Sequence, residues 1–262
     1  MISLTLTVKE RNILYGALLG DGCLCIHKNG INAVFQYCSK SSEHTHYMGE
    51  YMSRLSSSKS YYDYNYLDNR TNKRYYGTRF RTISNEALTN EYYKWYKDGK
   101  KHIPRDLILN SQICLIWYIG DGGVVHSNRS EFIKLSTHCF SKEEQEEILL
   151  PQLSRFNPHL FVADRTKDGK PLYAIYIPRK NMSDFLEYIG KCPLKDYEYK
   201  WKITAYKNRV PKNHKDKEKI FCDMYNKGMS YYKIAKFFNI EPNAVKYYLT
   251  KNNLYKREED TQ

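Results

Sequence analysis

The chain has 262 residues, enough for a core of roughly 200 residues and a small appended module. Its 42 Lys and Arg residues against 29 Asp and Glu residues give a formal net charge of +13, which attracts polyanions and makes nucleic acid the leading class of partner. The seven cysteines form no Cys-x-x-Cys pair, which argues against structural zinc, and no apolar run of about 18 residues suggests a membrane span.

Two apolar segments with the same ending are the first notable elements in chain order. Residues 14–22 and residues 114–122 both end in Gly-Asp-Gly, which places Asp21 and Asp121 at equivalent positions. Helices without charged residues are buried on nearly all sides, and Gly16 allows another backbone to approach closely. We therefore predict two buried helices that pack together and bring Asp21 and Asp121 to one point at their C-terminal ends.

The same order of predicted elements follows each apolar segment. Two short strands come first, at 23–27 and 33–38 in one copy and at 124–126 and 132–137 in the other. A polar helix is next, over about 42–55 and 142–153, and then a hairpin, at 61–67 with 74–83 and at 160–166 with 172–177. A helix near 86–96 or 182–189 closes each copy. This order predicts an α+β fold with a duplicated α-β-β-α-β-β-α unit, its halves spanning residues 1–104 and 105–208.

Polar residues recur at similar distances from the two aspartates. Lys101 follows Asp21 at nearly the same distance along the chain as Lys200 follows Asp121. A less regular pair is Lys40, which follows Asp21, and His138, which follows Asp121 at a slightly shorter distance. Coincidence explains either lysine equally well when it is taken alone, but both agree with a duplicated unit.

Two carboxylates beside the unpaired carbonyls of two helix ends form a hard-oxygen cluster suited to Mg²⁺. With metal bound, such a cluster can activate a water and stabilise the leaving 3′ oxygen in phosphodiester hydrolysis. Lys101, Lys200, Lys40 and His138 are then candidates to neutralise the developing charge or to orient the attacking water. A single Gly-Asp-Gly ending is better explained as a buried helix with a glycine cap, whereas two copies in register favour a shared site.

The paired segments resemble the signature of the LAGLIDADG homing endonucleases, and the resemblance covers roughly residues 7–205. It implies that Asp21 and Asp121 bind Mg²⁺ with help from the carbonyls of Gly20 and Gly120, and that Mn²⁺ or Ca²⁺ can substitute for binding. It also implies that Lys40, His138, Lys101 and Lys200 occupy the family's auxiliary polar and basic positions. The expected fold is saddle-shaped, with two four-stranded antiparallel sheets straddling double-stranded DNA. Ile116 departs from the pattern, because the family usually has glycine there.

The predicted sheets supply the candidates for contacts with DNA. Side chains alternate along a strand, so Arg79 and Arg81 share one face, with Phe80 and Thr82 on the other. Phosphate contacts outnumber base contacts, and a solvated surface role is the alternative for any one residue. The candidates are Gln36, Arg70, Lys73, Arg74, Arg79, Arg81, Lys134, Arg165 and Lys170.

A basic module over residues 209–262 follows the duplicated unit. Residues 209–257 contain 12 Lys and Arg against 4 Asp and Glu. The sequence predicts a linker over 209–215, a helix over about 216–226 that Gly228 ends, a second helix capped by Ser230, and a third beginning at Pro242. This order resembles a helix-turn-helix, in which the last helix enters a major groove. Its candidate DNA contacts are Asn243, Lys246, Tyr247 and Lys251. A three-helix appendage that binds no groove is the alternative.

These features together predict a monomeric homing endonuclease that cuts both strands of a long, asymmetric DNA site and leaves 3′ overhangs. Two other functions occur on this scaffold: a catalytically silent transcription regulator, which lacks the acidic residues, and a maturase, which binds intron RNA and assists splicing. We expect an intracellular, reducing location, without a membrane partner: the cytoplasm or nucleoid of a bacterium or phage-infected cell, or an organelle matrix.

Overall fold

The computed structural model describes residues 5–126, 131–203, 213–238 and 240–255. The chain divides into two compact units, residues 1–203 and residues 204–262, and each is described by itself. Among the helices of the described residues, none has the length and apolar composition that a membrane crossing requires.

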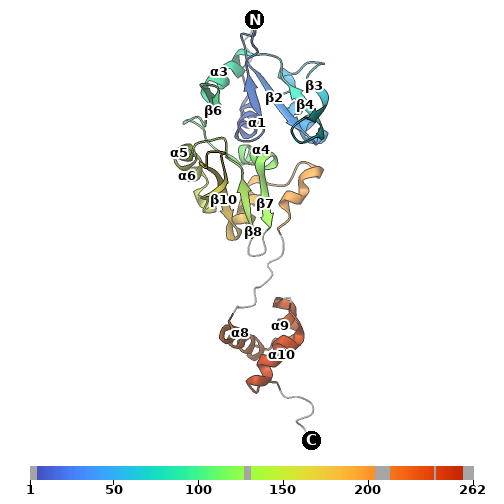
Figure 1. The fold of residues 1–262 in the computed structure, drawn as a ribbon, viewed down its shortest axis with the longest axis vertical. Helices are drawn as coiled ribbons and strands as arrows, with labels where there is room; N and C mark the ends of the chain where they lie inside the picture. The colour runs from blue at the N-terminus through green and yellow to red at the C-terminus, as the bar shows by residue number, and fades with distance from the viewer. Residues whose placement is uncertain (1–4, 127–130, 204–212, 239, 256–262) are drawn as a thin grey trace. The chain divides into compact units, whose positions relative to one another are not determined.

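The first half of the larger unit contains one four-stranded sheet and three α-helices (Figure 1). Its elements are α1 (Val8–Leu19), β1 (Cys23–Cys25), β2 (Val34–Ser39), α2 (Ser42–Tyr51), η1 (Ser53–Leu55), β3 (Tyr61–Asp68), β4 (Lys73–Arg81), α3 (Glu86–Trp95), β5 (Tyr96–Lys97) and β6 (Lys100–Lys101). The strands of this first sheet are antiparallel and have the order β1-β2-β4-β3. The short β5 and β6 pair only with each other among the described strands.

The second half repeats this arrangement. Its elements are α4 (Ser111–Asp121), β7 (Gly122–His126), β8 (Glu131–Leu135), α5 (Lys142–Glu144), η2 (Gln145–Leu149), α6 (Leu150–Gln152), η3 (Ser154–Phe156), β9 (His159–Arg165), β10 (Pro171–Pro178), η4 (Arg179–Asn181), α7 (Met182–Ile189) and η5 (Lys195–Trp201). The second sheet is antiparallel in the equivalent order β7-β8-β10-β9. The α+β fold with two four-stranded sheets is therefore confirmed, and the predicted boundary at 104/105 lies between β6 and α4.

Local sequence signals explain where the elements begin and turn. Thr7 and Glu10 form a reciprocal capping box at the start of α1, and Ser141 and Glu144 form the same motif at the start of α5. Every strand of the two sheets begins and ends within two residues of its predicted bounds. Gly169 turns between β9 and β10 with a φ of 76°, a conformation that glycine adopts without a steric penalty.

The two halves share one hydrophobic core, at whose centre α1 and α4 lie side by side (Figure 1). Leu14 and Leu18 of α1 and Trp117 of α4 are fully buried. Phe80 from the first sheet and Ile175 from the second enclose the helix pair. Neither half therefore buries its apolar helix alone, and the twin helix provides the missing partner surface.

Two helix predictions and the linker prediction need correction. The helix predicted over 42–55 ends at Tyr51 and continues as the separate turn η1. The helix predicted over 142–153 contains a π-helical turn, η2, because Pro151 has no N–H to continue the normal hydrogen-bond pattern. The predicted linker over 209–215 extends too far: His214 begins α8, since the Asn213 side chain caps that helix, while residues 209–212 lie outside the described residues.

Within its described residues, 213–238 and 240–255, the smaller unit contains three helices around a core of its own. They are α8 (His214–Asn226), α9 (Tyr231–Phe238) and α10 (Pro242–Lys251). Phe221, Ile234, Val245 and Leu249 are buried between them. Gly228 follows α8 with a φ of 87°, as expected for a helix-ending glycine. The three predicted helices are confirmed.

Candidate active site

Close packing of α1 against α4 brings the two Gly-Asp-Gly segments together. At the N-terminal ends, Asn12 Nδ2 donates to Gln112 Oε1 at 3.0 Å, and Asn110 Nδ2 donates to Asn12 Oδ1 at 3.1 Å. At the other ends, a Cβ added to Gly20 would lie 3.5 Å from the Asp121 Cβ and 3.6 Å from its Oδ2. The carboxyl group of one segment therefore rests against the backbone of the other, as the spacing predicted.

The two aspartates occupy different positions on their helices. α1 ends at Leu19, so Asp21 lies beyond it and is exposed. Asp121 is the last residue of α4 and is half-buried. Burial and the neighbouring negative charge of Asp21 raise the pKa of Asp121 to about 6, while the ammonium groups of Lys101 and Lys200 oppose the shift. A carboxyl group whose ionisation is made costlier by a neighbouring carboxylate is suited to sharing a cation with that neighbour.

Lys101 caps the C-terminal end of α1, which with α4 carries a Gly-Asp-Gly ending; we call α1 and α4 the signature helices. Its Nζ donates to the carbonyl oxygens of Leu18, Gly20 and Gly22 at 3.0, 3.2 and 2.9 Å. A cation at this helix end stabilises carbonyls that have no partner within the helix. Burial lowers the pKa of the Lys101 ammonium, and nearby negative groups, including the Asp121 and Asp21 carboxylates, counter that effect.

Lys200 repeats this arrangement at the second signature helix. Its Nζ donates to the Ile119 carbonyl at 2.5 Å and to the Gly120 carbonyl at 3.2 Å. The Tyr118 hydroxyl donates to the Lys200 carbonyl at 2.5 Å and holds its backbone in place. Burial lowers the pKa of Lys200 to about 8, against the opposing charges of Asp121 and Asp21. Lys101 and Lys200, which follow their aspartates at nearly equal distances along the chain, therefore occupy equivalent positions at the ends of α1 and α4.

The segments that carry these lysines are held by helices of the opposite halves. The neighbours of Lys101 are fixed by Glu144 of α5, whose Oε1 accepts from Ile103 N at 2.9 Å and lies 3.1 Å from His102 Nδ1. On the other side, Asp196 of η5 accepts from the Ser41 hydroxyl at 2.7 Å. Each lysine is thus fixed to one signature helix and braced by the other half.

A buried aromatic cluster beside the aspartates was missed by sequence reasoning. The Tyr37 hydroxyl lies 3.1 Å from His44 Nε2, and the rings of His44 and Tyr197 are 4.8 Å apart. Burial, followed by the negative charge of Asp21, raises the pKa of Tyr37 well above its usual value. His44 occupies the same position after its helix cap, Ser41, as Glu144 does after Ser141, and this equivalence was the available signal.

Lys40 and His138 are not brought to the aspartates by any contact among the described residues, and neither lies within a helix. Lys40 is exposed, and its Nζ lies 5.7 Å from the centre of the Tyr75 ring. His138 lies in a turn, where burial and then the charge of Lys134 lower its pKa, while Asp164 opposes them. The roughly similar distances of Lys40 and His138 from their aspartates along the chain therefore do not by themselves show that the two residues occupy equivalent positions.

The first sheet gathers most of its DNA-contact candidates on the face away from the core. Arg79 and Arg81 are half-buried there, while Phe80 and Thr82 are buried on the opposite face, which confirms the predicted alternation. Gln36 is the register partner of Arg81, so the two share that outer face. Their neighbours form a row of tyrosines, and Arg79 Nη1 donates to the Tyr62 hydroxyl at 3.0 Å.

Other candidates of the first sheet lie at its distal hairpin. Lys73 is an even number of positions from Arg79 along β4, so it shares the outer face. Arg74 lies on the opposite face, where its Nη1 donates to Asn65 Oδ1 at 3.1 Å. Arg70 lies in the exposed turn and pairs with Asp68 at 3.7 Å. These three are exposed and far along the hairpin from Arg79 and Arg81.

The second sheet places its three candidates apart from one another. Lys134 lies on the outer face of β8, where its positive charge contributes to lowering the pKa of Asp121 against the effect of burial. Arg165 ends β9, and its Nη1 donates to the Gly169 carbonyl at 2.9 Å. Lys170 is exposed in the adjoining turn. Only Lys134 therefore lies near the aspartates.

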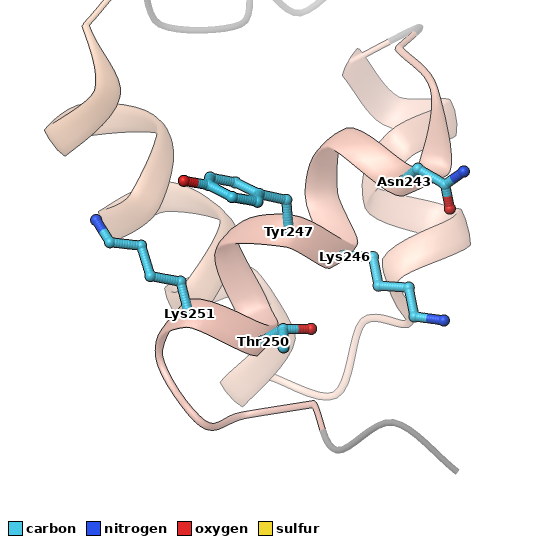
Figure 2. A pocket seen from close by; sticks show the side chains of 5 residues that line it. All are labelled: Asn243, Lys246, Tyr247, Thr250 and Lys251. Carbon is cyan, nitrogen blue, oxygen red and sulfur yellow. The ribbon is translucent and has the colours of Figure 1, made fainter. Parts of the chain in front are cut away.

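The smaller unit presents its four candidates on one helix. Figure 2 shows Asn243, Lys246, Tyr247, Thr250 and Lys251 extending from α10, where they line a hollow of about 460 Å³. The Tyr247 side chain is 61% exposed. Lys251 Nζ donates to Glu218 Oε2 at 2.9 Å, so its charge is partly engaged within the unit.

The donor set at the helix ends fits a hard divalent cation. The Asp121 carboxylate rests against Gly20 and is near enough to Asp21 for their charges to interact, and the Gly20 and Gly120 carbonyl oxygens lie at the same helix ends. No cluster of three or more His, Cys, Asp or Glu side chains suited to a metal exists within the described ranges, so additional ligands would come from water and phosphate, as is usual for Mg²⁺. Both glycine carbonyls accept lysine hydrogen bonds, which leaves the carboxylates as the principal protein ligands.

Comparison with known proteins agrees with this geometry. The model of the LAGLIDADG DNA endonuclease family matches residues 11–185. The DNA endonuclease I-ChuI of Chlamydomonas applanata is 26% identical over 200 residues, which are 71% of this chain and 91% of that protein. The uncharacterized protein MJ1098 of Methanocaldococcus jannaschii is 40% identical over 53 residues, which are 20% of this chain and only 21% of the relative's length.

A solved structure shares the fold. The homing endonuclease I-WcaI bound to its DNA recognition sequence superposes with a TM-score of 0.67 and 22% sequence identity, over 77% of this chain and 89% of that chain. The family expected from the two Gly-Asp-Gly segments is confirmed. With its duplicated fold, its converging aspartates and a family match over most of its length, the chain belongs to the LAGLIDADG DNA endonuclease family.

Proposed function

We propose that this chain is a site-specific homing endonuclease that uses Mg²⁺ to hydrolyse both strands of a long DNA duplex and leaves 3′ overhangs. The observation that carries the proposal is the packing of Asp121 against Gly20, within electrostatic reach of Asp21, at the ends of two packed helices that each hold a lysine at their end. The names of two relatives support it: I-ChuI is a DNA endonuclease, and I-WcaI is a homing endonuclease bound to its recognition sequence.

In this proposal the aspartates bind the metal and the lysines stabilise negative charge. Asp21 and Asp121 would hold Mg²⁺, with the Gly20 and Gly120 carbonyls beside them, and Mn²⁺ or Ca²⁺ would substitute for binding. When bound, the metal activates water and stabilises the leaving 3′ oxygen. Lys101 and Lys200 place positive charge beside the carboxylates, where it stabilises the additional negative charge of the transition state. Lys40 and His138 stay proposed auxiliary groups that order solvent.

The duplex would lie along the outer faces of the two sheets. This proposal assigns contacts to bases or phosphates to Gln36, Arg70, Lys73, Arg74, Arg79, Arg81, Lys134, Arg165 and Lys170. The helix α10 would enter a major groove with Asn243, Lys246, Tyr247 and Lys251, because these side chains project together from its exposed face. The formal charge of +13 would strengthen binding through release of DNA counterions.

A monomer accounts for the chemistry, because one chain supplies both carboxylates and both sheets. The two halves differ in sequence, so the two half-sites of the duplex differ as well. The proposed setting is inside a cell, in the cytoplasm, the nucleoid or an organelle matrix. The structural observations favour cleavage over the silent regulator, because both acidic residues are present and converge.

The experiment starts from a library of duplexes with a randomised central region, incubated with the full chain and Mg²⁺. Linear products are recovered and sequenced, which gives the target and the stagger of the cut. Asp21→Asn and Asp121→Asn should each abolish double-strand cleavage of that target while Ca²⁺-dependent binding persists. Asp184→Asn, an exposed residue of α7, is the matched control and should cut normally. Double-strand cleavage by either site variant at the wild-type rate would refute the proposal.

A further inference from the structure

The two sheets have the same topology but chemically different outer faces. Along the first sheet, the outer positions of β3 and β4 carry tyrosine hydroxyls and guanidinium groups. The rings of Tyr64 and Tyr66 lie 5.9 Å apart and those of Tyr66 and Tyr75 lie 5.6 Å apart, with the Arg79 guanidinium 5.7 Å from the Tyr64 ring. This face is rich in hydrogen-bond donors and acceptors.

The corresponding face of the second sheet is apolar at its centre. Phe132 of β8 lies 4.7 Å from Tyr176 of β10 and 5.9 Å from Phe161 of β9, measured between ring centres. Val125 of β7 pairs with Phe132, and Ala174, fully buried, pairs with Phe161. The register places all five on one face, since Ile133 and Ile175 point into the core from the alternate positions.

In the part of the sheet that the structure describes, a few charged or titratable side chains flank the apolar residues of this outer face. Lys134 of β8 and His159 of β9 are the register partners of Tyr176 on its two sides, with the His159 ring 6.1 Å from that of Tyr176, and Asp164 is paired with Leu172 near the hairpin. The described outer positions of β7, β8, β9 and β10 between Gly123 and Tyr176 include no Arg, Gln or Asn. The apolar cluster of Val125, Phe132, Phe161 and Tyr176 therefore has few groups that could hydrogen-bond with a base edge.

We propose that this apolar cluster contacts thymine methyl groups in the major groove, so that the half-site under the second sheet is specified by T·A pairs. The inference rests on the proposed DNA endonuclease function. The thymine methyl is the one apolar group that the base pairs present in that groove. A guanine or cytosine edge would lose hydrogen bonds to water and gain none from Val125, Phe132 or Phe161, which disfavours G·C pairs over these three side chains.

The outer face of the first sheet favours base pairs that are recognised by hydrogen bonds instead of by apolar contact. Arg79 and Arg81 share the outer face with Gln36, and arginine pairs with the O6 and N7 atoms of guanine while glutamine pairs with adenine. A DNA duplex is the favoured occupant of the apolar cluster, because Lys134 connects the cluster to the aspartates and the equivalent sheet carries a cationic face. The two half-sites would thus be distinguished by different physical forces.

The test uses the duplex selected by cleavage, and binding is measured in Ca²⁺ so that cutting does not interfere. Arg79→Ala and Arg81→Ala first identify the half-site under the first sheet, because specificity is relaxed only there. Each thymine of the other half-site is then replaced by deoxyuridine, which lacks only the methyl group. We expect the Kd to rise about threefold for each methyl removed over the cluster. The same replacement in the first half-site should have little effect.

A variant tests whether the cluster itself detects the methyl group. In Phe161→Thr, the smaller side chain should reduce the difference in Kd between the duplexes with thymine and with deoxyuridine, whereas Tyr64→Ala, on the first sheet, should keep the wild-type difference. Thermal melting checks that both variants fold, and if Phe161→Thr does not fold, the wild-type comparison still decides the result.

Two results would overturn the inference. One is tight binding of the selected duplex with no effect of deoxyuridine in the second half-site. The other is a concentration-dependent dimer that Phe161→Thr disrupts, which would assign the cluster to a second copy of the chain. A protein that selects no duplex at all would instead contradict the proposed function, so the two failures are distinct.

Discussion

Gly16 of α1 lies directly against Ile116 of α4, so that a Cβ added to Gly16 would come within 2.6 Å of both the Ile116 Cβ and the Ile113 carbonyl oxygen. The contact between α1 and α4 is therefore asymmetric. The glycine of α1 leaves room for the branched isoleucine side chain of α4. The family's usual glycine at position 116 is not needed for this contact, because the absent side chain of Gly16 leaves room for Ile116. This contact determines how near Asp21 and Asp121 can come.

Replacing Gly16 by alanine should destabilise the larger unit and slow cleavage. A methyl group at this position overlaps α4, and overpacking of this kind costs about 1–3 kcal/mol. Urea denaturation of the two variants would measure the loss, with Gly123→Ala as the control because a Cβ there meets nothing within 4 Å. Equal stability of Gly16→Ala and Gly123→Ala would show that the helices are farther apart than described.

Replacing Lys101 or Lys200 by methionine should lower the rate of DNA cleavage on the order of 100-fold for each, because a buried cation beside the developing charge is lost. Binding of DNA in Ca²⁺ should change much less, since both lysines contact helix-end carbonyls and are largely removed from the surface. Lys100→Met, at an exposed neighbouring position, is the control for lost charge. An equal loss of rate in Lys100→Met would indicate a general electrostatic effect.

Replacing Glu144 by glutamine should weaken the bracing of the Lys101 segment. Although burial raises the pKa of Glu144, hydrogen bonds from the backbone N–H groups of Ile103 and Ser141 lower it below its ordinary value. Its stabilising contribution is therefore present above pH 4.5 and lost as the pH falls.

The Glu144→Gln variant should be less stable at pH 7 by about 1–2 kcal/mol, with a smaller difference near pH 3. Chemical denaturation at the two pH values measures this, and Glu146→Gln, which removes a surface pair with Lys142, is the control. A difference for Glu144→Gln that is the same at both pH values would contradict the assigned role of the carboxylate.

His44 should make the larger unit sensitive to mild acid. Burial, and then the charge of Lys200, lower the pKa of His44 to about 4 from its ordinary value of 6.5. A depressed histidine pKa means that the folded state binds fewer protons than the unfolded chain between these values. The stabilisation is therefore complete above pH 6.5 and is lost as the pH falls toward 4.

His44→Gln should reduce this loss, because glutamine does not titrate. Between pH 6.5 and pH 4 the wild-type free energy of unfolding should fall more than that of the variant, by on the order of 3 kcal/mol. His46→Gln, at an exposed position two residues away, should retain the wild-type pH dependence. Parallel curves for wild type and His44→Gln would show that His44 is not buried as a neutral ring.

The sequence by itself determined the duplicated order of elements, the pairing of Asp21 with Asp121 and the alternation of Arg79 with Phe80. These features follow from local periodicity and from equal spacing, which a linear chain displays directly. The capping box of Ser141 and Glu144 is likewise a local arrangement, whereas the hydrogen bond from Ile103 to Glu144 depends on how the two halves pack.

Only the tertiary structure decided which side chains surround the aspartates. Tyr37, His44 and Tyr197 come from β2, α2 and η5, and they meet because those elements close over the ends of α1 and α4. Lys40 has a similar offset from Asp21 as His138 has from Asp121, yet neither has a described contact with an aspartate. Distance in space depends on how elements pack, and a similar spacing along the chain does not by itself determine it.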